Sequence, residues 1–170
     1  FTIFRAATAI MRKAGSGSLV AFTSGAFQGS VAQANYSAAK GGIVSLVRSA
    51  ALGLYRYGVR ANAVAPVART RMSENVPAGL VEIGEAEDVA PMCAYLLSDR
   101  AADVTGQIYT AVGSRIAVWN QPQEVRSMTT EGRWTPEAIA DRIDEIGQEE
   151  MPLMGPLKDG LAKAQQEAEA

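Results

Sequence analysis

The stretch SLVAFTSGAFQGSVAQANYSAAKGG, residues 18–42, combines three patterns that together indicate an α/β fold. Its first six residues, 18–23, form a short apolar run of the kind found in strands that are buried on both faces. A loop that contains Gly and Ser follows over 24–33. From residue 35 to residue 57 apolar side chains recur at helical spacing and predict a long amphipathic helix, with one face formed by Ile43, Val47, Ala50 and Leu54.

The alternation of helix and strand continues on both sides of this stretch. Short apolar strands that alternate with helices imply a parallel sheet with right-handed crossovers and helices on both faces. The sequence therefore predicts a doubly wound α/β fold with three strands, whereas such folds usually carry about six. The predicted elements are a helix over 1–14, a strand over 18–23, a helix over 35–57, a strand over 59–66, a helix over 85–98 and a strand over 106–113.

The composition restricts the chemistry that the chain can perform. The chain has no histidine, which excludes acid–base catalysis and zinc binding through imidazole. Cys93 is its one cysteine, so no disulfide can form within the chain, and the apolar surroundings of Cys93 predict a core position. No carboxylates are spaced like a metal-binding loop, and we expect no metal site. Any catalysis must therefore use Tyr, Lys, Ser, Thr or carboxylate side chains.

Charge and hydropathy restrict the partners. The sequence has no window of about 18 uncharged apolar residues, so we expect no membrane span. Basic residues are not clustered as nucleic-acid binding requires, and we expect no nucleic-acid partner. The first residues, FTIFRAATAIMRKAG, carry their basic residues after the apolar run, which is the wrong order for a signal peptide. We therefore expect a cytoplasmic protein.

The chain divides into two regions of different composition. Residues 1–117 contain the predicted α/β elements, whereas residues 118–170 are predicted to form a helical, acidic extension. A helix in this extension starts at Thr135, an N-cap residue followed by Pro, and residues 131–170 hold 10 Asp and Glu against 4 Lys and Arg, a net charge of −6. The chain starts at Phe1, without methionine, in the apparent middle of a helix, so we expect it to be part of a longer protein.

Tyr36 and Lys40 are the first candidates for chemistry. They lie four residues apart and therefore share one face of the predicted helix. The strand before them ends in FTS, at the carboxyl edge of the sheet, where open α/β proteins bind ligands. A phenol has a pKa of about 10, so exchange of its proton near neutral pH needs a neighbouring cation. The alternative is an ordinary half-exposed tyrosine and a solvated lysine.

Taken in order, these motifs resemble those of the short-chain dehydrogenases/reductases. That family has a serine at the end of its fifth strand, YxxxK on the next helix and a proline-containing loop after its sixth strand. The corresponding residues here are Ser24 or Thr23, Tyr36 with Lys40, and the run NAVAPVARTRM. The resemblance covers residues 1–117 and implies a Rossmann-like fold and an oxidoreductase that uses NAD or NADP.

The resemblance also implies roles for individual residues. Tyr36 is the general acid/base of a hydride transfer, and Lys40 stabilises the phenolate and binds the nicotinamide ribose. A hydroxyl at the strand end holds the substrate oxygen. Thr23 stands 13 positions before Tyr36, the usual separation, and Ser24 stands 12 positions before it; we favour Ser24, because the FTS strand end resembles members whose serine has this role. Matches to positions that approach the nicotinamide are Pro66, Val67 and Thr70.

The loop after the predicted strand over 59–66 indicates a branch of the family. Its sequence APVARTRMS is one residue shorter than the APGxxxT loop of the 3-oxoacyl-carrier-protein reductases. It is more similar to the loop of the (3R)-3-hydroxyacyl-CoA dehydrogenase part of multifunctional β-oxidation enzymes, as is the TPEA helix start. We therefore expect an acyl-CoA or steroid-like substrate, with a carrier-protein reductase as the alternative. Arg69 and Arg71 suit either CoA or pyrophosphate binding or ordinary solvation.

Part of the family pattern has no counterpart in the chain. We expect the TGxxxGxG cofactor loop, the NNAG strand end and the catalytic asparagine to precede Phe1. Without that half the chain would be a catalytically silent fragment that acts as an interaction module, which is the alternative of another class. In the family, the helices that match residues 1–13 and 37–56 join copies into a homodimer or homotetramer, so we expect an oligomer. We also expect an exposed apolar edge at the first strand.

Overall fold

The computed structural model describes residues 1–71, 73, 82–152 and 154–169. The chain splits into two compact units, Phe1–Asn120 and Gln121–Ala170. The first unit holds a sheet with its flanking helices, and the elements described in the second unit are helical.

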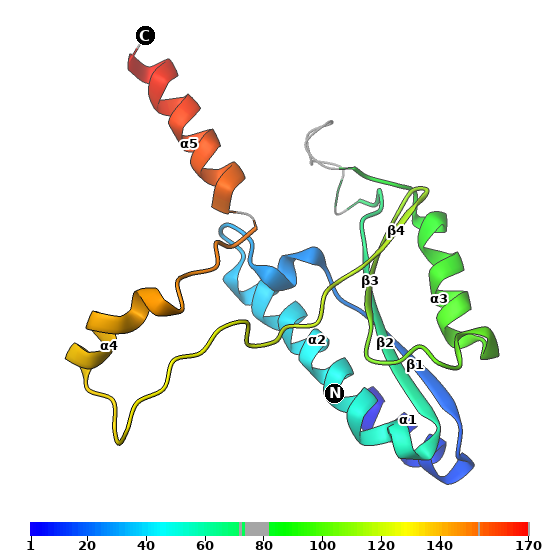
Figure 1. Cartoon of the computed structure of the whole chain (residues 1–170). Helices are drawn as coiled ribbons and strands as arrows, with labels where there is room; N and C mark the ends of the chain where they lie inside the picture. The colour runs from blue at the N-terminus through cyan, green and yellow to red at the C-terminus, as the bar shows by residue number, and fades with distance from the viewer. Residues whose placement is uncertain (72, 74–81, 153, 170) are drawn as a thin grey trace. The chain divides into compact units, whose positions relative to one another are not determined.

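The sheet of the first unit has four strands in the order β1-β2-β3-β4. Strands β1 (Gly17–Phe22), β2 (Val59–Pro66) and β3 (Ile108–Val112) run parallel, so their carboxyl ends meet at one edge of the sheet (Figure 1). The three predicted strands are thus confirmed. β1 forms one lateral edge of the sheet, where Phe22 is 50% exposed, as expected for the first strand.

A fourth strand, β4 (Arg115–Val118), corrects the predicted count of three. It follows β3 through a tight turn and pairs with β3 in antiparallel orientation, with Ile116 opposite Ala111. Ile116 and Val118 are both more than half exposed. β4 is four residues long and is separated from β3 by two residues, so its short apolar run over 116–119 does not stand out in the sequence as a strand of its own.

Helices cover both faces of the sheet, as predicted for a doubly wound fold (Figure 1). One face carries α1 (Thr2–Ala14) and α2 (Ala34–Leu54), which continues as a 3₁₀ turn at Tyr55–Tyr57. The other face carries α3 (Ala90–Leu97), between 3₁₀ turns at Ala86–Val89 and Asp99–Ala101. The core on the α2 face includes Val44, Val47, Ala61, Ala63 and Ile108, and the core on the α3 face includes Val64, Leu96 and Ala111.

The ends of the first two helices meet in a close backbone contact. Gly15 ends α1 and Gly58 ends the turn after α2, with φ angles of 69° and 67°. A Cβ at residue 58 would lie 2.6 Å from the Gly15 carbonyl oxygen, so a side chain there would force the two ends apart. Gly58 closes the long helical segment in a left-handed conformation that favours glycine.

The second unit contains α4 (Pro136–Arg142), a 3₁₀ turn at Ile143–Glu145 and α5 (Met154–Glu169). The predicted helix start is confirmed, because Thr135 Oγ1 accepts a hydrogen bond from the Ala138 N–H at 3.2 Å. Arg142 donates to the Glu145 carboxylate, and this hydrogen bond lowers the pKa of Glu145. Among the described residues, no helix has both the length and the apolar character that crossing a membrane requires.

Asn62 is a fully buried polar residue in the middle of β2. Its Nδ2 donates to the Val104 carbonyl at 2.8 Å, and its Oδ1 accepts from the Gln107 N–H at 3.0 Å. The side chain therefore joins β2 to the segment that leads into β3, and both ends of its amide are used.

We expect Asn62→Leu to lower the free energy of unfolding by about 1–3 kcal/mol, because it removes both hydrogen bonds from a buried position. Chemical denaturation measures the difference. Asn35→Leu, at an exposed position of α2, is the matched control and is expected to stay within about 0.5 kcal/mol of the parent. Equal stability of Asn62→Leu and the parent would contradict the structural role of this amide.

Candidate active site

The candidate site lies at the carboxyl edge of the sheet, where β1 and β2 end beside the first turns of α2. Ser24 follows β1, Pro66 ends β2, and Tyr36 and Lys40 belong to α2. The predicted residues come from three elements because a parallel sheet brings the ends of its strands to one edge.

Two hydrogen bonds of opposite direction join the end of β1 to α2. Thr23 Oγ1 donates to the main-chain carbonyl of Lys40 at 2.9 Å, and Lys40 Nζ donates to the Phe22 carbonyl at 3.3 Å. Thr23 is 2% exposed, and its N–H also donates to the Val64 carbonyl of β2 at 2.8 Å. These bonds fix the position of Lys40 relative to the strand ends.

Tyr36 and Lys40 are neighbours along α2, as their spacing predicts. Lys40 Nζ lies 5.5 Å from the centroid of the Tyr36 ring, within the range of a cation–π contact. Tyr36 is 39% exposed, so its phenol is accessible to a ligand, whereas Lys40 is half-buried. The pair therefore combines an accessible phenol with an ammonium group that is hydrogen-bonded to the end of β1.

Ser24 and Thr23 differ in what their hydroxyls do. Ser24 is the N-cap of the 3₁₀ turn η1 (Gly25–Gln28), and its Oγ accepts a hydrogen bond from the Ala26 N–H at 3.3 Å. As an acceptor in that bond, the Ser24 hydroxyl keeps its own proton for another partner. Thr23 already donates its proton to Lys40. The geometry therefore favours Ser24 over Thr23 as the hydroxyl that can hold a ligand.

A parallel bridge between Ala68 and Gly84 fixes the start of the loop after β2. The Gly84 N–H donates to the Val67 carbonyl at 3.1 Å, and the Arg69 N–H donates to the Gly84 carbonyl at 2.7 Å. Pro66 and Val67, which precede the bridge in the sequence, are half-buried, whereas Thr70, which follows it, is exposed. The predicted loop runs on through Pro77, and its residues 72 and 74–77 lie outside the described residues.

Gly84 shapes this loop, although nothing in the sequence pattern singles it out. A Cβ at residue 84 would lie 2.2 Å from the Gly113 nitrogen and 2.8 Å from Asp88 Oδ2, so a side chain there would push the loop away from β3. The Asp88 carboxylate accepts from the Glu85 N–H at 2.7 Å in a capping box that starts the next helical segment. The available signal was a glycine directly before a predicted helix start, which many ordinary turns share.

Other reactive side chains lie on other elements. Cys93, on α3, is half-buried, and burial raises the pKa of its thiol. Tyr57 lies beyond the far end of α2; burial would raise the pKa of its phenol, but a hydrogen bond from Arg12 and the charges of Arg12 and Arg56 lower it. In the part of the chain that the structure describes, no group of three or more His, Cys, Asp or Glu side chains is placed to hold a metal ion.

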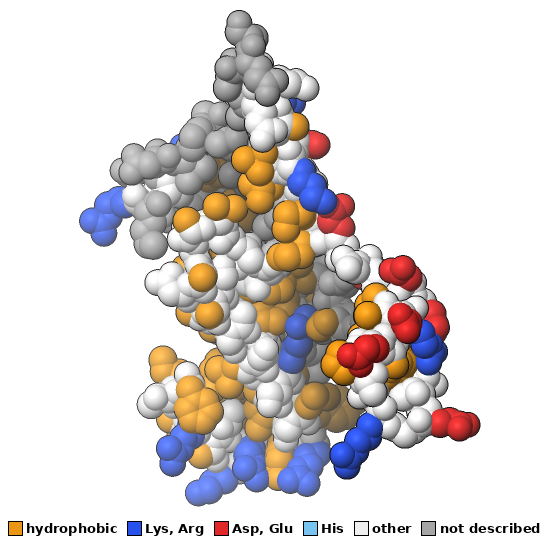
Figure 2. All heavy atoms as spheres, turned by 90° about the vertical axis from the view of Figure 1, so that its left-hand side faces the viewer, with side chains coloured by type: hydrophobic (Ala, Val, Ile, Leu, Met, Phe, Trp, Pro, Cys, Tyr) orange, Lys and Arg blue, Asp and Glu red, His pale blue; other side chains and the backbone are white. Residues whose placement is uncertain are grey.

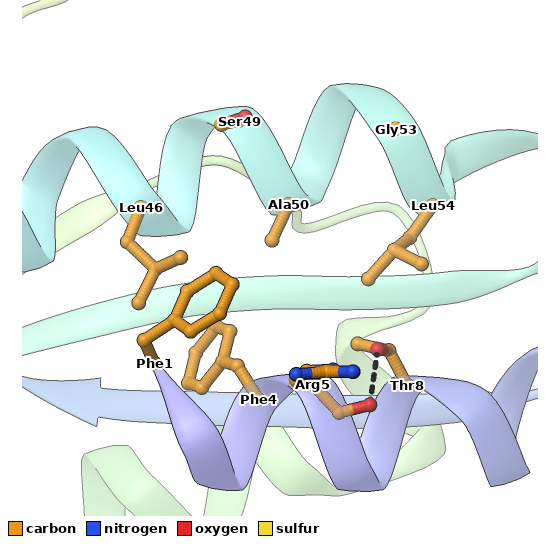
Figure 3. Close-up of a pocket in the computed structure, with 9 residues that line it drawn as sticks. All are labelled: Phe1, Phe4, Arg5, Thr8, Leu46, Ser49, Ala50, Gly53 and Leu54. Carbon is orange, nitrogen blue, oxygen red and sulfur yellow. Dashed lines mark hydrogen bonds between the residues drawn. The ribbon is translucent and has the colours of Figure 1, made fainter.

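A cavity of about 320 Å³ lies between α1 and α2 (Figure 3). Its lining is largely apolar, and Ser24, Tyr36 and Lys40 do not contribute to it. The cavity is therefore separate from the candidate active site. The apolar side chains that line it are Phe1, Phe4, Leu46, Ala50 and Leu54.

Known proteins resemble the chain in both sequence and fold. A family model described as enoyl-(acyl carrier protein) reductase matches residues 1–113. The chain is 40% identical over 116 residues to the hydroxyacyl-CoA dehydrogenase ChsB1 of Mycobacterium tuberculosis, an alignment that covers 64% of this chain and 37% of ChsB1. It is 36% identical over 126 residues to a 3-oxoacyl-[acyl-carrier-protein] reductase of Synechocystis, covering 68% of this chain and 51% of the reductase.

A solved structure extends this likeness to the fold. The crystal structure of a short chain dehydrogenase from Mycobacterium avium is 39% identical and superposes with a TM-score of 0.72, covering 84% of this chain and 51% of that one. The chain thus matches between 37% and 51% of the length of these three proteins.

We expect Thr23→Val to lower the free energy of unfolding by about 1 kcal/mol or more, because it removes a hydrogen bond to the Lys40 carbonyl at a buried position. Thr8→Val is the matched control: the Thr8 hydroxyl also donates to a main-chain carbonyl, that of Arg5, but in an exposed part of α1. Denaturation curves compare the two variants. A larger loss for Thr8→Val than for Thr23→Val would contradict the importance of the link.

Proposed function

Because the chain belongs to the short-chain dehydrogenase/reductase family, we propose that it carries the proton-transfer half of an NAD(P)-dependent oxidoreductase. The reaction transfers a hydride between a nicotinamide and a hydroxyl or keto group of the substrate. The observation that carries this proposal is the link between β1 and α2, which holds Lys40 against the Tyr36 ring with Ser24 in the adjoining turn.

Three side chains take part in the proton transfer: Tyr36 exchanges the proton, and Lys40 and Ser24 assist it. In the direction of oxidation, the Tyr36 phenolate accepts the proton of the substrate hydroxyl as the hydride leaves the carbon atom. The ammonium group of Lys40 stabilises the phenolate through its charge, and the Ser24 hydroxyl donates to the substrate oxygen and holds it in place. In the direction of reduction, Tyr36 returns the proton to the carbonyl oxygen. The bound nicotinamide supplies or accepts the hydride.

The residues present fit the nicotinamide end of such a cofactor. Lys40 Nζ uses a donor on the Phe22 carbonyl and has further N–H donors for the hydroxyls of a ribose. Pro66 and Val67 lie at the same edge of the sheet. The Gly-rich turn that binds a pyrophosphate has no counterpart in this sequence, so the chain's own residues account for proton transfer and for contacts with the nicotinamide half.

We assign the substrate to the 3-hydroxyacyl-CoA class, ahead of a carrier-protein-bound or steroid-like substrate. The sequence of the loop after β2 and the likeness to ChsB1 support this order. Arg69 forms an ion pair with Glu85 at 3.5 Å in which both side chains are more than 60% exposed. Exposed ion pairs of this kind contribute little to stability, so the guanidinium of Arg69 can exchange its partner for a CoA phosphate.

The cytoplasmic location expected from the sequence is also part of this proposal.

Copies of the protein associate, on this proposal, through the face formed by α1 and α2. Large apolar side chains are exposed on this face, at Phe1, Ile3, Ile10 and Leu52, each more than 70% accessible. Figure 2, seen from the left-hand side of Figure 1, shows hydrophobic side chains at the surface among polar ones, with several Lys and Arg side chains at the lower end of the view. Exposed apolar patches of this kind mark interaction surfaces, which supports a homodimer or homotetramer.

We expect Tyr36→Phe to lower kcat of the full-length protein by about 100-fold or more, because it removes the group that exchanges the proton. Ser24→Ala is expected to lower kcat by about 100-fold through loss of a donor to the substrate oxygen. Initial rates with NAD and NADP on hydroxyacyl-CoA, acyl-carrier-protein and hydroxysteroid substrates measure these effects and identify the substrate class. Tyr55→Phe, at an exposed tyrosine just beyond the other end of α2, is the control and keeps the parent rate.

Full activity of Tyr36→Phe would refute the assignment of the general acid/base. A full-length parent protein that binds neither NAD nor NADP and turns over none of the substrates would favour the silent interaction module instead. Tight cofactor binding without turnover of the hydroxyacyl-CoA would refute the substrate class alone.

The surface proposed for association predicts that Leu52→Asp shifts the full-length protein to a smaller assembly in light scattering, because a charge replaces an exposed apolar side chain on α2. Leu97→Asp is the matched control, since Leu97 is 55% exposed but ends α3, on the other face of the sheet. Dissociation by Leu97→Asp alone would place the interface on the α3 side.

A further inference from the structure

Trp119, the residue after β4, contacts the turn that begins at Ser24. Its indole ring meets the Phe27 ring edge to face, with the centroids 4.8 Å apart and the planes at 67°. A Cβ built on Gly25 would lie 3.8 Å from Trp119 Cζ2, which places the indole in van der Waals range of the residue after Ser24. The ring of Trp119 therefore rests against the 3₁₀ turn η1.

The indole of Trp119 is itself held by the sheet. Its Nε1 donates to Thr110 Oγ1 at 2.9 Å in a half-buried setting, and its main-chain N–H donates to the Ile108 carbonyl at 2.9 Å. Thr110 and Ile108 belong to β3, which is paired on both sides. Because an indole has a single N–H donor, the bond to Thr110 selects the orientation in which the ring meets η1.

The orientation of the Ser24 hydroxyl depends on η1. The Ser24 Oγ accepts from the Ala26 N–H, and the Ser24 carbonyl accepts from the Phe27 N–H at 3.0 Å. On its other side η1 approaches α2 closely, since a Cβ at Gly41 would lie 3.7 Å from the Phe27 carbonyl oxygen. The turn is thus held between α2 and the indole of Trp119.

We propose that Trp119 is a positioning residue for Ser24. By its bond to Thr110 and its contact with Phe27, it holds η1 in the conformation in which the Ser24 hydroxyl faces the substrate oxygen. Tyr36 and Lys40 are held separately, through α2 and the link to β1. This inference rests on the proposed function, and it predicts that loss of the Trp119 support acts on the same step as loss of the Ser24 hydroxyl.

A double-mutant cycle tests the inference in the full-length protein. Thr110→Val removes the acceptor with little change in volume, and Trp119→Phe keeps an aromatic ring without the N–H. We expect each to lower kcat by about 10-fold with an unchanged KM for the nicotinamide cofactor, since a small misplacement of a reacting group is enough for such a loss. In a Ser24→Ala background, Thr110→Val is expected to cause no further loss, because the two changes affect one function.

Amide hydrogen exchange provides a second test of the positioning role, and this measurement does not depend on turnover. The Phe27 and Gly29 amides donate to the Ser24 and Ala26 carbonyls within η1 and are expected to exchange faster in Thr110→Val. Thr105→Val is the matched control, because Thr105 Oγ1 accepts from the Ala61 N–H at 3.1 Å near the opposite end of β3. It is expected to leave both the exchange of η1 and kcat unchanged.

The possible outcomes separate the two proposals. If Ser24→Ala impairs turnover but Thr110→Val and Trp119→Phe do not, or if their losses multiply with that of Ser24→Ala, the positioning role of Trp119 is overturned and the proposed function stands. If Ser24→Ala retains full activity, the assigned role of Ser24 fails and the positioning role fails with it. Unchanged exchange of η1 in Thr110→Val also overturns the inference.

Discussion

The reciprocal link between the end of β1 and α2 determines the geometry of the candidate site. Thr23 uses its side chain to bind the backbone of the helix, and Lys40 uses its side chain to bind the backbone of the strand. A single bond would fix one distance, whereas two bonds of opposite direction also fix how far the helix is shifted along the strand. The phenol and the ammonium group therefore reach the edge of the sheet together.

The link also explains why the neighbouring hydroxyls of Thr23 and Ser24 have different hydrogen-bond partners. Successive residues at the end of an extended strand point to opposite sides, so Thr23 turns toward α2 and Ser24 turns into η1. A buried threonine that donates to a helix carbonyl is a structural residue. A half-buried serine that only accepts a bond from its own turn keeps a donor for a ligand. The usual separation of 13 positions from Tyr36 points to Thr23, whose hydroxyl already donates to the Lys40 carbonyl.

Much of the first unit can be predicted from the sequence, because its signals are local. The parallel strands are continuous apolar runs, the long helix has one apolar face, and Tyr36 and Lys40 are one helical turn apart. β4 escapes prediction because it is stabilised by pairing with β3 and not by burial of its own side chains.

The parts of the site that escape prediction depend on contacts between distant segments. Trp119 lies 92 positions from Phe27, and nothing in its neighbours indicates that its ring meets η1. The structure shows that its ring contacts the turn after Ser24. Gly84 also depends on a distant segment: the close approach of Gly113 leaves no room for a side chain at residue 84.

The bridge between Ala68 and Gly84 has a consequence for how such a scaffold diverges. The bridge and two backbone hydrogen bonds join the two ends of the segment between these residues. Insertions, deletions and exchanges within that segment can therefore accumulate over evolution without displacing Pro66 and Val67. The length and side chains of this segment can in this way change independently of the end of β2, and one scaffold can carry many different loops.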